Sequence, residues 1–339
     1  MKIVTFGEVM LRLTPNLYDR FVQANTFNAS FGGAEANVAV SLAQFGLHAA
    51  FVTKLPKHEI GESALWSLRK VGVDTSHIAR GGERVGIYFL EKGASQRASK
   101  VVYDRTNSSI ATAHAEDFDW NQILQGADWF HFTGITPALS DELASILLEA
   151  LKQAKKRGIF VSTDLNYRAK LWTKEKANSV MSSLMSYVDL CIANEQDAED
   201  VFGIKSEHSS LITGEINKEE YIEVAQKLQE RFGFQYVAIT LRESLSANVN
   251  NWSAMLYNGK KSYFSKTYNI QIVDRVGGGD SFGAGLIYAL SQKYTSQEAI
   301  EFAVAASCLK HTIEGDYNFV TVEEVKKLMG GDGSGRVSR

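Results

Sequence analysis

The chain alternates short runs of β-branched and aromatic residues with longer helical patterns, and no other feature restricts its fold as strongly. Runs such as KIVTFG (2–7) and IFVSTDLN (159–166) have the length and composition of strands buried in a parallel sheet. Most intervals carry a helical repeat, as in residues 141–158, where Asp141 lies near the start and Gly158 at the expected C-cap. Because strands that alternate with helices form a sheet covered on both faces, we predict a doubly wound, mostly parallel α/β fold.

Two segments depart from this alternation. Residues 11–31 and 84–104 alternate polar and apolar side chains with a period of two and contain no long helical repeat. They predict a second, smaller β-sheet, called the small sheet below, attached to one main domain that spans residues 1–325. The glycine-rich tail at 326–339 is low in complexity and is predicted to be disordered.

Composition narrows the class of ligand. The 339 residues are 45% hydrophobic, enough for a substantial core, and carry a net charge of −3. Lysines and arginines are spread along the chain, so we expect a small-molecule ligand and neither a nucleic acid nor a membrane as partner. No apolar stretch has the length of a signal peptide or a membrane span, and Cys191 and Cys308 stand in apolar surroundings. We therefore expect reduced thiols in a cytoplasmic protein.

The stretch DRVGGGDSFGAG, residues 274–285, places three glycines and an aspartate at the start of a predicted helix. Its glycine spacing fits neither the dinucleotide-binding fingerprint nor the Walker A loop. Glycines before a helix do allow backbone N–H groups to converge on an anion. Asp280 is then either an N-cap or a base that accepts the proton of a hydroxyl attacking a phosphoryl group. An N-cap alone does not require three glycines, which favours the base.

Two motifs resemble those of a known family. Residues 274–285 are similar to the C-terminal signature D-T-x-G-A-G-D-x-F of the ribokinase-like, or PfkB-type, carbohydrate kinases, and GGAEANVAVSLAQFG (32–46) resembles their N-terminal signature. The resemblance covers residues 2–325 and implies that the small sheet is a lid on the main domain. It also implies transfer of a phosphoryl group from ATP to a sugar hydroxyl with Mg²⁺, and leaves activation by a monovalent cation open. The implied general base is Asp280, and the implied anion hole consists of the amides of Gly277, Gly278 and Gly279.

The nucleotide end departs from the family pattern. Arg275 stands where the family often has Thr, and the family's N-x-x-E motif ends in Asp, so either Asp197 or Glu195 is the candidate Mg²⁺ ligand. The loop after Thr240 lacks the family's glycines, and we expect Arg242 or the nearby asparagines to contact ATP instead. By motif position, the residues expected near the nucleotide are Asn194, Thr240, Arg242, Asp274, Gly277 and Gly279.

The candidate acceptor site begins with two segments of the main domain. The family pattern assigns Gly33 and Asn37, at the start of a helix rich in small residues, to the hydroxyls of the acceptor. In STDLNYR, Asp164, Asn166 and Arg168 alternate at the end of a predicted parallel strand, where α/β proteins bind ligands. A solvated loop is the competing interpretation of these three residues.

The small sheet adds Tyr88, Tyr103 and Arg105 to the candidate site. Tyrosines in strands more often pack than bind, but Arg105 and Arg168 together exceed what a neutral sugar needs and suit a carboxylate. The set resembles that of the 2-keto-3-deoxygluconate kinases, which phosphorylate the 6-hydroxyl of 2-dehydro-3-deoxy-D-gluconate. The arginines would then bind the carboxylate while Asp280 takes the proton from the hydroxyl.

Other functions share many of these residues. A fructokinase or ribokinase would use the same chemistry on a neutral sugar, and a kinase for the galactonate epimer would differ at one hydroxyl. A catalytically silent sensor of sugar acids would keep the fold without needing Asp280. The missing dinucleotide fingerprint disfavours an oxidoreductase. Because a sheet with exposed edges can pair with a second copy, we also expect a homo-oligomer formed through the small sheet.

Overall fold

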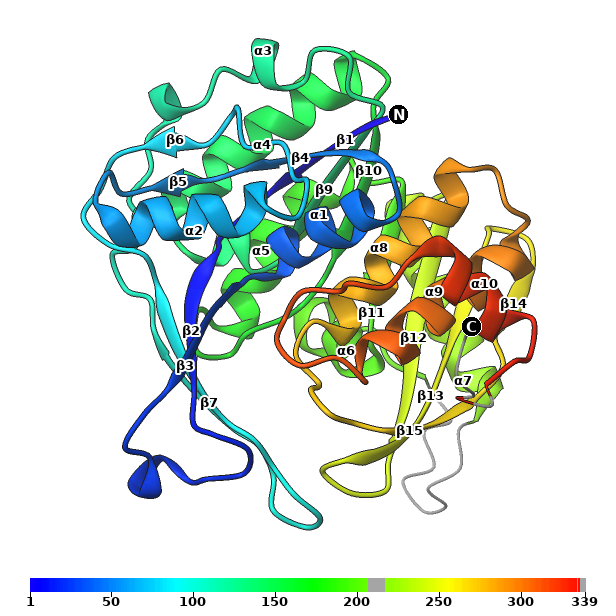
Figure 1. Ribbon diagram of the computed structural model, residues 1–339. Helices are drawn as coiled ribbons and strands as arrows, with labels where there is room; N and C mark the ends of the chain where they lie inside the picture. Colours follow the sequence, from blue (N-terminus) through cyan, green and yellow to red (C-terminus); the bar gives the residue numbers. More distant parts are fainter. Residues whose placement is uncertain (207–216, 334, 336–339) are drawn as a thin grey trace.

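The computed structural model describes residues 1–206, 217–333 and 335. A nine-stranded sheet forms its centre, with strand order β14-β13-β12-β11-β10-β9-β1-β4 and β15 paired with β13 (Figure 1). From β4 to β12 all neighbours are parallel, and β13 to β15 pair antiparallel. The strands are β1 (Lys2–Phe6), β4 (His48–Val52), β9 (Trp129–Thr133), β10 (Phe160–Asp164), β11 (Leu190–Ala193), β12 (Tyr236–Ser244), β13 (Val249–Tyr257), β14 (Ser262–Phe264) and β15 (Tyr268–Gln271).

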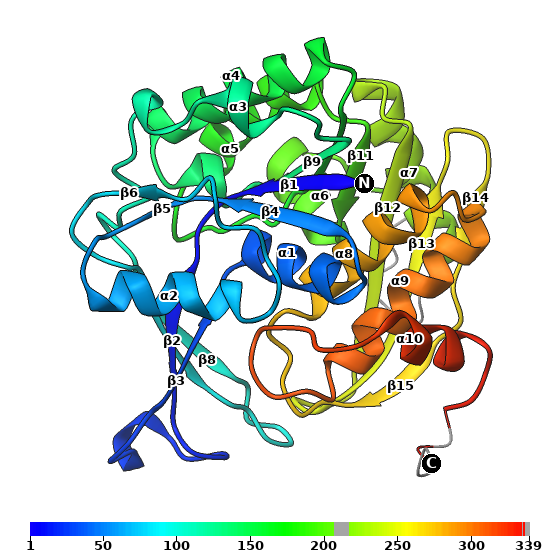
Figure 2. The same cartoon turned by 45° about the horizontal axis from the view of Figure 1, so that its top comes forward.

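Helices cover both faces of this sheet, as Figures 1 and 2 show. One hydrophobic core is built by helices α3 to α7 and the other by α1, α2, α8, α9 and α10. Successive residues of a strand enter opposite cores, as Trp129 and Phe130 do, which explains why whole strands read as apolar. The helices are α1 (Ala34–Gln44), α2 (Glu59–Arg69), α3 (Trp120–Ile123), α4 (Asp141–Lys156), α5 (Lys174–Met185), α6 (Glu195–Phe202), α7 (Lys218–Phe232), α8 (Gly278–Ser291), α9 (Ser296–Lys310) and α10 (Val322–Met329).

Local chemistry sets the ends of these helices. The Ser140 hydroxyl accepts a hydrogen bond from the Leu143 amide and so caps the start of α4. Gly158, after the end of α4, adopts a φ of 69°, and Gly233 ends α7 with a φ of 77°. The helix predicted at 141–158 is confirmed as α4, which ends at Lys156. The sheet order and the helices on both faces confirm the doubly wound α/β class.

The two segments with period-two alternation form a separate four-stranded sheet with the order β3-β2-β7-β8. Its strands are β2 (Met10–Thr14), β3 (Asn28–Gly32), β7 (Ile87–Glu91) and β8 (Lys100–Asp104). The small sheet extends away from the main domain in Figure 1, so it contributes one face to any ligand site between the two parts. Two short strands, β5 (Lys54–Leu55) and β6 (Ala79–Arg80), pair on their own, and 3₁₀ turns occupy Phe21–Gln23, Ala115–Asp117 and Thr136–Ala138.

The small sheet contacts the main domain at its base and at its tip. At the base, Arg12 of β2 is 1% exposed and pairs with Asp274 at 2.5 Å and Asp316 at 2.8 Å. At the tip of the β7–β8 hairpin, the Ser95 carbonyl oxygen accepts a hydrogen bond of 2.7 Å from the amide of Ala247, in the β12–β13 loop. The Ser95 amide donates to Asn248 of the same loop at 3.1 Å.

The boundary predicted for the disordered tail is wrong by at least four residues. Helix α10 continues to Met329, with Thr321 and Glu324 forming a capping box and Val325 buried in the core. Residues 334 and 336–339 of the predicted tail lie outside the described residues. Both cysteines are free, as expected, and the described part of the chain contains no helix long and apolar enough to cross a membrane.

Candidate active site

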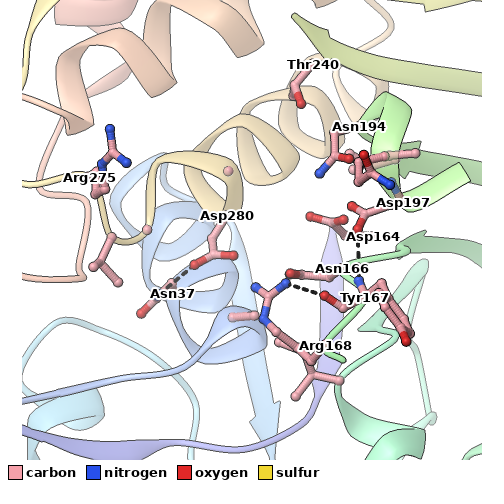
Figure 3. Close-up of a pocket in the computed structure, with 18 of the residues that line it drawn as sticks. Asn37, Asp164, Asn166, Tyr167, Arg168, Asn194, Asp197, Thr240, Arg275 and Asp280 are labelled. Atoms are coloured by element: carbon pink, nitrogen blue, oxygen red, sulfur yellow. Dashed lines mark hydrogen bonds between the residues drawn. The ribbon is translucent and has the colours of Figure 1, made fainter. Parts of the chain in front are cut away.

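A cleft of about 1040 Å³ opens at the carboxyl ends of the parallel strands. Its wall is built by the residues that follow β10 and β11, by β12, by the first turns of α1 and α8, and by β7 and β8 of the small sheet. Figure 3 shows part of this wall. Open α/β sheets bind ligands at this end because loops from neighbouring strands converge there. The cleft is large enough for two small substrates side by side.

Asp280 is the third residue of α8 and points into the cleft (Figure 3). Gly277 occupies the N-cap position, so the interpretation of Asp280 as an N-cap is wrong. Its carboxylate accepts a hydrogen bond of 2.7 Å from the Asn37 side-chain amide, 243 residues away in the chain. This contact forms because α1 packs against α8 (Figure 2). The two sequence motifs thus meet at one carboxylate.

The three glycines before Asp280 differ in what an added side chain would meet. Gly277 has a φ of 81°, and a Cβ there would lie 2.2 Å from the Asp316 carbonyl oxygen. A Cβ on Gly278 would lie 2.4 Å from the His311 ring. A Cβ on Gly279 would meet no atom within 4 Å, so this glycine leaves open space where α8 begins. The start of α8 is therefore accessible to an anion.

Burial raises the pKa of Asp280 to about 7. The hydrogen bond from Asn37 opposes this rise, the charges of Asp316 and Glu35 add to it, and Arg168 lowers it. A carboxylate with a pKa near 7 is a stronger base than an ordinary aspartate and is still ionised in part at neutral pH. Asp280 therefore has the properties of a general base.

The chain turns into the cleft directly after β10. Asn166 adopts a left-handed φ of 42°, which asparagine tolerates better than most residues. This turn brings Asp164, Asn166 and Arg168 to the same wall, as predicted, although a turn and not strand alternation places the last two. Arg168 Nη1 donates to the Tyr167 carbonyl oxygen at 2.8 Å, which holds the guanidinium beside Asp280 (Figure 3).

Three carboxylates of this wall lie close enough to Arg168 for its charge to affect their pKa values. Burial raises the pKa of Asp164 well above its usual range, and the neighbouring charges of Asp197 and Asp280 raise it further. Burial also raises the pKa of Asp197 to about 6. Arg168 lowers the pKa of all three groups, so its positive charge stabilises their ionised forms.

The small sheet supplies the opposite wall. The Tyr88 hydroxyl donates to both carboxylate oxygens of Asp316, at 2.6 and 2.7 Å, and Tyr103 is 38% exposed. Arg105 is buried, pairs with Glu8, and has its guanidinium 5.5 Å from the centroid of the Tyr103 ring. Its Nε has no hydrogen-bond partner among the described residues. Arg105 therefore lines the cleft with its Nε buried and its charge shared with Glu8.

The residues predicted near the nucleotide lie at one side of the cleft. Asn194, Thr240 and Arg242 all line it, and the Asn194 side chain caps α6 by accepting from the Asp197 amide at 2.8 Å. The side chain of Glu195 lies outside the described part of the structure. Among the described residues, no three His, Cys, Asp or Glu side chains form a metal-binding group. Metal binding here would need ligand oxygens from a substrate.

The structure does not bring Asp274 to the cleft wall. Its carboxylate is 2% exposed, pairs with Arg12, and accepts a hydrogen bond of 3.1 Å from the Gly315 amide. Gly278 does not line the cleft either, and the His311 ring occupies the space beside it. Of the predicted acceptor residues, Gly33 and Asn37 line the cleft at the start of α1.

Among the wall residues that sequence reasoning missed are Arg275, Trp252, His311 and Asp316. Trp252 of β13 and His311 after α9 lie with ring centroids 5.3 Å apart. Arg275 stands inside the recognised motif, and its departure from Thr was the one local signal available. Trp252, His311 and Asp316 belong to no motif, and only the fold places them beside the glycines.

Comparison with known proteins identifies relatives along almost the whole chain. A family model described as pfkB family carbohydrate kinase matches residues 1–322. The 2-dehydro-3-deoxygalactonokinase of Haloferax volcanii is 31% identical over 334 residues, 98% of each chain. The 2-dehydro-3-deoxygluconokinase of Bacillus subtilis is 27% identical over 325 residues, 95% of this chain and 93% of the relative.

A solved structure is more similar still. The crystal structure of 2-dehydro-3-deoxygluconokinase from Thermotoga maritima is 56% identical in sequence and matches with a TM-score of 0.94. The match covers 98% of both chains, so it includes the small sheet as well as the main domain. The predicted likeness to this group of kinases is confirmed.

Proposed function

This chain belongs to the pfkB family of carbohydrate kinases, and we propose that it transfers the γ-phosphoryl group of ATP to the 6-hydroxyl of 2-dehydro-3-deoxy-D-gluconate. The observation that carries the proposal is Asp280, a carboxylate with a pKa of about 7 at an open helix start, in a cleft that also presents Arg105 and Arg168. The relatives named above act, by their names, on sugar acids of this kind.

Asp280 accepts the proton of the 6-hydroxyl as its oxygen attacks the γ-phosphorus. The new O–P bond forms while the bond from the γ-phosphorus to the bridging oxygen breaks, and ADP leaves with that oxygen. The amides of Gly277 and Gly279, at the positive end of α8, hold the oxygens of the transferred group. The Gly278 amide, also expected in this role, donates to the Arg275 carbonyl oxygen at 3.3 Å and would have to exchange that bond. Gly279 leaves the space that this group needs.

The residues of the cleft suit Mg²⁺ as the ion that accompanies ATP. Mg²⁺ binds one or two carboxylates and completes its shell with phosphate oxygens and water, so it needs no three-residue cluster. Either Asp197 or Glu195 would hold it. The charge of Asp197 raises the pKa of Asp164, so Asp164 lies near this position. When bound, Mg²⁺ offsets the negative charge of the phosphoryl oxygens.

The acid end of the acceptor is assigned to the arginines. Arg168 is held beside Asp280 by the Tyr167 carbonyl oxygen, and Arg105 lines the cleft with its guanidinium over the Tyr103 ring. A neutral sugar needs neither positive charge, whereas a carboxylate uses both. The acceptor then lies between the small sheet and α8, with Asn37, Asn166 and Gly33 near its hydroxyls.

The test measures ADP release from ATP and Mg²⁺ with 2-dehydro-3-deoxygluconate, its galactonate epimer, fructose and ribose. Asp280→Asn should lower kcat by about a hundredfold or more, in the range of a lost general base. A preference for fructose or ribose would favour the neutral-sugar alternative. Absence of turnover with all four would favour a silent sensor. The ratio of kcat/KM for the two epimers decides between gluconate and galactonate.

The arginine assignment is tested by Arg168→Gln. Arg105 neutralises the buried Glu8, so a substitution of Arg105 would disturb the fold as well as the site. Arg168 is therefore the residue chosen for the test. We expect KM for the sugar acid to rise roughly tenfold, the scale of one charge-assisted hydrogen bond, while KM for a slowly used neutral sugar stays unchanged. The assay is run at pH 8.5 so that Asp280 is ionised in both proteins. Lys170→Gln, an exposed residue two positions away, is the matched control. Equal losses on both acceptors would contradict the assignment.

We also propose that copies of the chain associate through the small sheet. Its strands and loops expose apolar side chains, among them Leu17, Val22 and Val102, which are 80%, 91% and 50% exposed. Light scattering of the wild type and of Val22→Asp tests this. A monomeric wild type would contradict it.

A further inference from the structure

Arg242 and Arg275 face the cleft without an acidic partner. Arg242 lies on β12, and Arg275 lies on the loop before α8, two residues ahead of Gly277. In the ranges that the structure describes, neither guanidinium pairs with a carboxylate. Arg275 is half-buried and donates from Nη2 to the Ala247 carbonyl oxygen at 3.2 Å. A half-buried guanidinium with one neutral acceptor keeps its positive charge unpaired and has further N–H groups that can bind an anion.

The two positive charges lie close enough to affect each other. Burial and the charge of Arg242 both lower the pKa of Arg275. Like charges at a cleft wall repel each other unless an anion lies between them. In Figure 3, Arg275 lies on the opposite side of Asp280 from Asp164 and Asp197. These two carboxylates therefore do not supply the anion between the arginines.

The histidine beside the two arginines carries no charge at neutral pH. Trp252 lies directly opposite Arg242 in the register of β12 and β13, and it packs on His311. Burial lowers the pKa of His311 to about 4, so this ring is neutral, and it lies against Gly278. The anion-accepting groups at this side of the cleft therefore include the two arginines and the backbone amides at the start of α8.

The geometry points to a clamp in which Arg242 and Arg275 bind the β- and γ-phosphates of the nucleotide. A chain of two or more phosphates carries several charges and planar sets of oxygens, which suit guanidinium groups better than a single carboxylate does. The loop after Thr240 has no glycines to offer backbone amides, so side chains take over this contact. The inference rests on the proposed function only in taking a nucleoside triphosphate as donor.

The Ala247 contact gives the clamp a second property. Ala247 accepts from Arg275 through its carbonyl oxygen and donates through its amide to Ser95 at the tip of the small sheet. One peptide segment thus joins a phosphate-binding side chain to the wall that binds the acceptor. Arg275 is held in its orientation while the tip is in contact with the β12–β13 loop.

Isothermal titration calorimetry with two probes tests the clamp. The probes are the magnesium complex of AMP-PCP, an ATP analogue with a non-transferable γ-phosphate, and AMP, which lacks the β- and γ-phosphates. Arg242→Gln and Arg275→Gln should each weaken AMP-PCP binding roughly tenfold and change AMP binding less than about twofold. Lys260→Gln, which removes an exposed charge near the far end of β13, should change neither.

Unchanged AMP-PCP affinity in both variants, or equal losses for AMP and AMP-PCP, would overturn the clamp. Arg242 is exposed, so its variant keeps the test valid even if Arg275→Gln folds poorly, and melting curves identify that case. Arg275→Lys keeps the charge but not the planar fork, and an intermediate loss supports the clamp. If the wild type binds AMP-PCP through the arginines yet phosphorylates no sugar acid, the proposed acceptor is wrong and the clamp stands.

Discussion

Replacing Asp280 by asparagine should stabilise the protein at pH 8 while it removes catalysis. The carboxylate has a pKa of about 7 in the folded protein against 3.8 for an ordinary aspartate, because burial disfavours its charge. Asparagine keeps an oxygen that accepts the hydrogen bond from Asn37 and carries no charge to bury. The variant thus removes an unfavourable charge and preserves the contact around it.

The magnitude and its sign follow from the two pKa values. Below pH 4 Asp280 is protonated in both the folded and the unfolded chain, so Asp and Asn are nearly equivalent. Between pH 4 and 7 only the unfolded chain ionises, and the folded state loses stability by at most about 1.4 kcal/mol per pH unit. The limit above pH 7 is about 4 kcal/mol, and residual exposure of the side chain reduces it to roughly 2 kcal/mol.

Thermal unfolding at pH 5, 6, 7, 8 and 9 measures this difference. With an unfolding entropy of about 2.1 cal/mol/K per residue, 2 kcal/mol raises Tm of a chain this long by about 3 °C. The gain should grow with pH and level off above pH 7. Asp19→Asn, which removes an exposed carboxylate, should give no such trend. A gain independent of pH, or a variant less stable than wild type at pH 8, would refute the reasoning.

Three further outcomes are expected. Since the base must be ionised, kcat/KM should rise about tenfold per pH unit below pH 7 and level above it, and a flat profile between pH 5 and 8 would contradict the role of Asp280. Gly279→Ala should keep Tm and lower kcat, because the added methyl enters open space needed by the phosphoryl group. Gly278→Ala should lower Tm, because its methyl group would clash with the buried His311 ring. Equal Tm changes in the two variants would count against this geometry. Arg12→Met should lower the free energy of unfolding in urea by about 3–5 kcal/mol, because it leaves two buried carboxylates unpaired, and a loss below about 1 kcal/mol would show that they are solvated.

Local patterns were sufficient to predict the central architecture. The parallel strands of the central sheet, such as β1, β9 and β11, are apolar runs bounded by turns, because both of their faces are buried in cores. The period of two in the small sheet reflects two faces that differ in burial, as in β2, where Arg12 and its face are buried while Leu11 and Leu13 are half-buried. The tail was misjudged because the glycines after residue 329 masked the amphipathic turn that ends at Met329.

The candidate site was predicted where a motif or a strand end carried it, and missed where contacts join distant segments. Asp274 has the family's motif position, yet its partner is Arg12, 262 residues away, and no local spacing reports that pairing. Arg105 was predicted to bind the carboxylate of the acceptor, but Glu8, 97 residues away, already neutralises part of its charge. Neither partner belongs to a motif, so only the folded chain shows which charges remain for a ligand.

The attachment of the small sheet is unequal at its two ends. At its base, Arg12 holds two buried carboxylates, whereas its tip is held by two hydrogen bonds of Ser95 and by the ion pair of Lys92 with Glu314, whose carboxylate is exposed. Such hydrogen bonds contribute about 0.5–1.5 kcal/mol each, and exposed ion pairs less than about 1 kcal/mol. Thermal fluctuation therefore detaches the tip far more often than the base. We therefore expect the sheet to pivot about its base beside the glycine turn, so that ligands enter and leave at the tip while the reacting groups keep their positions.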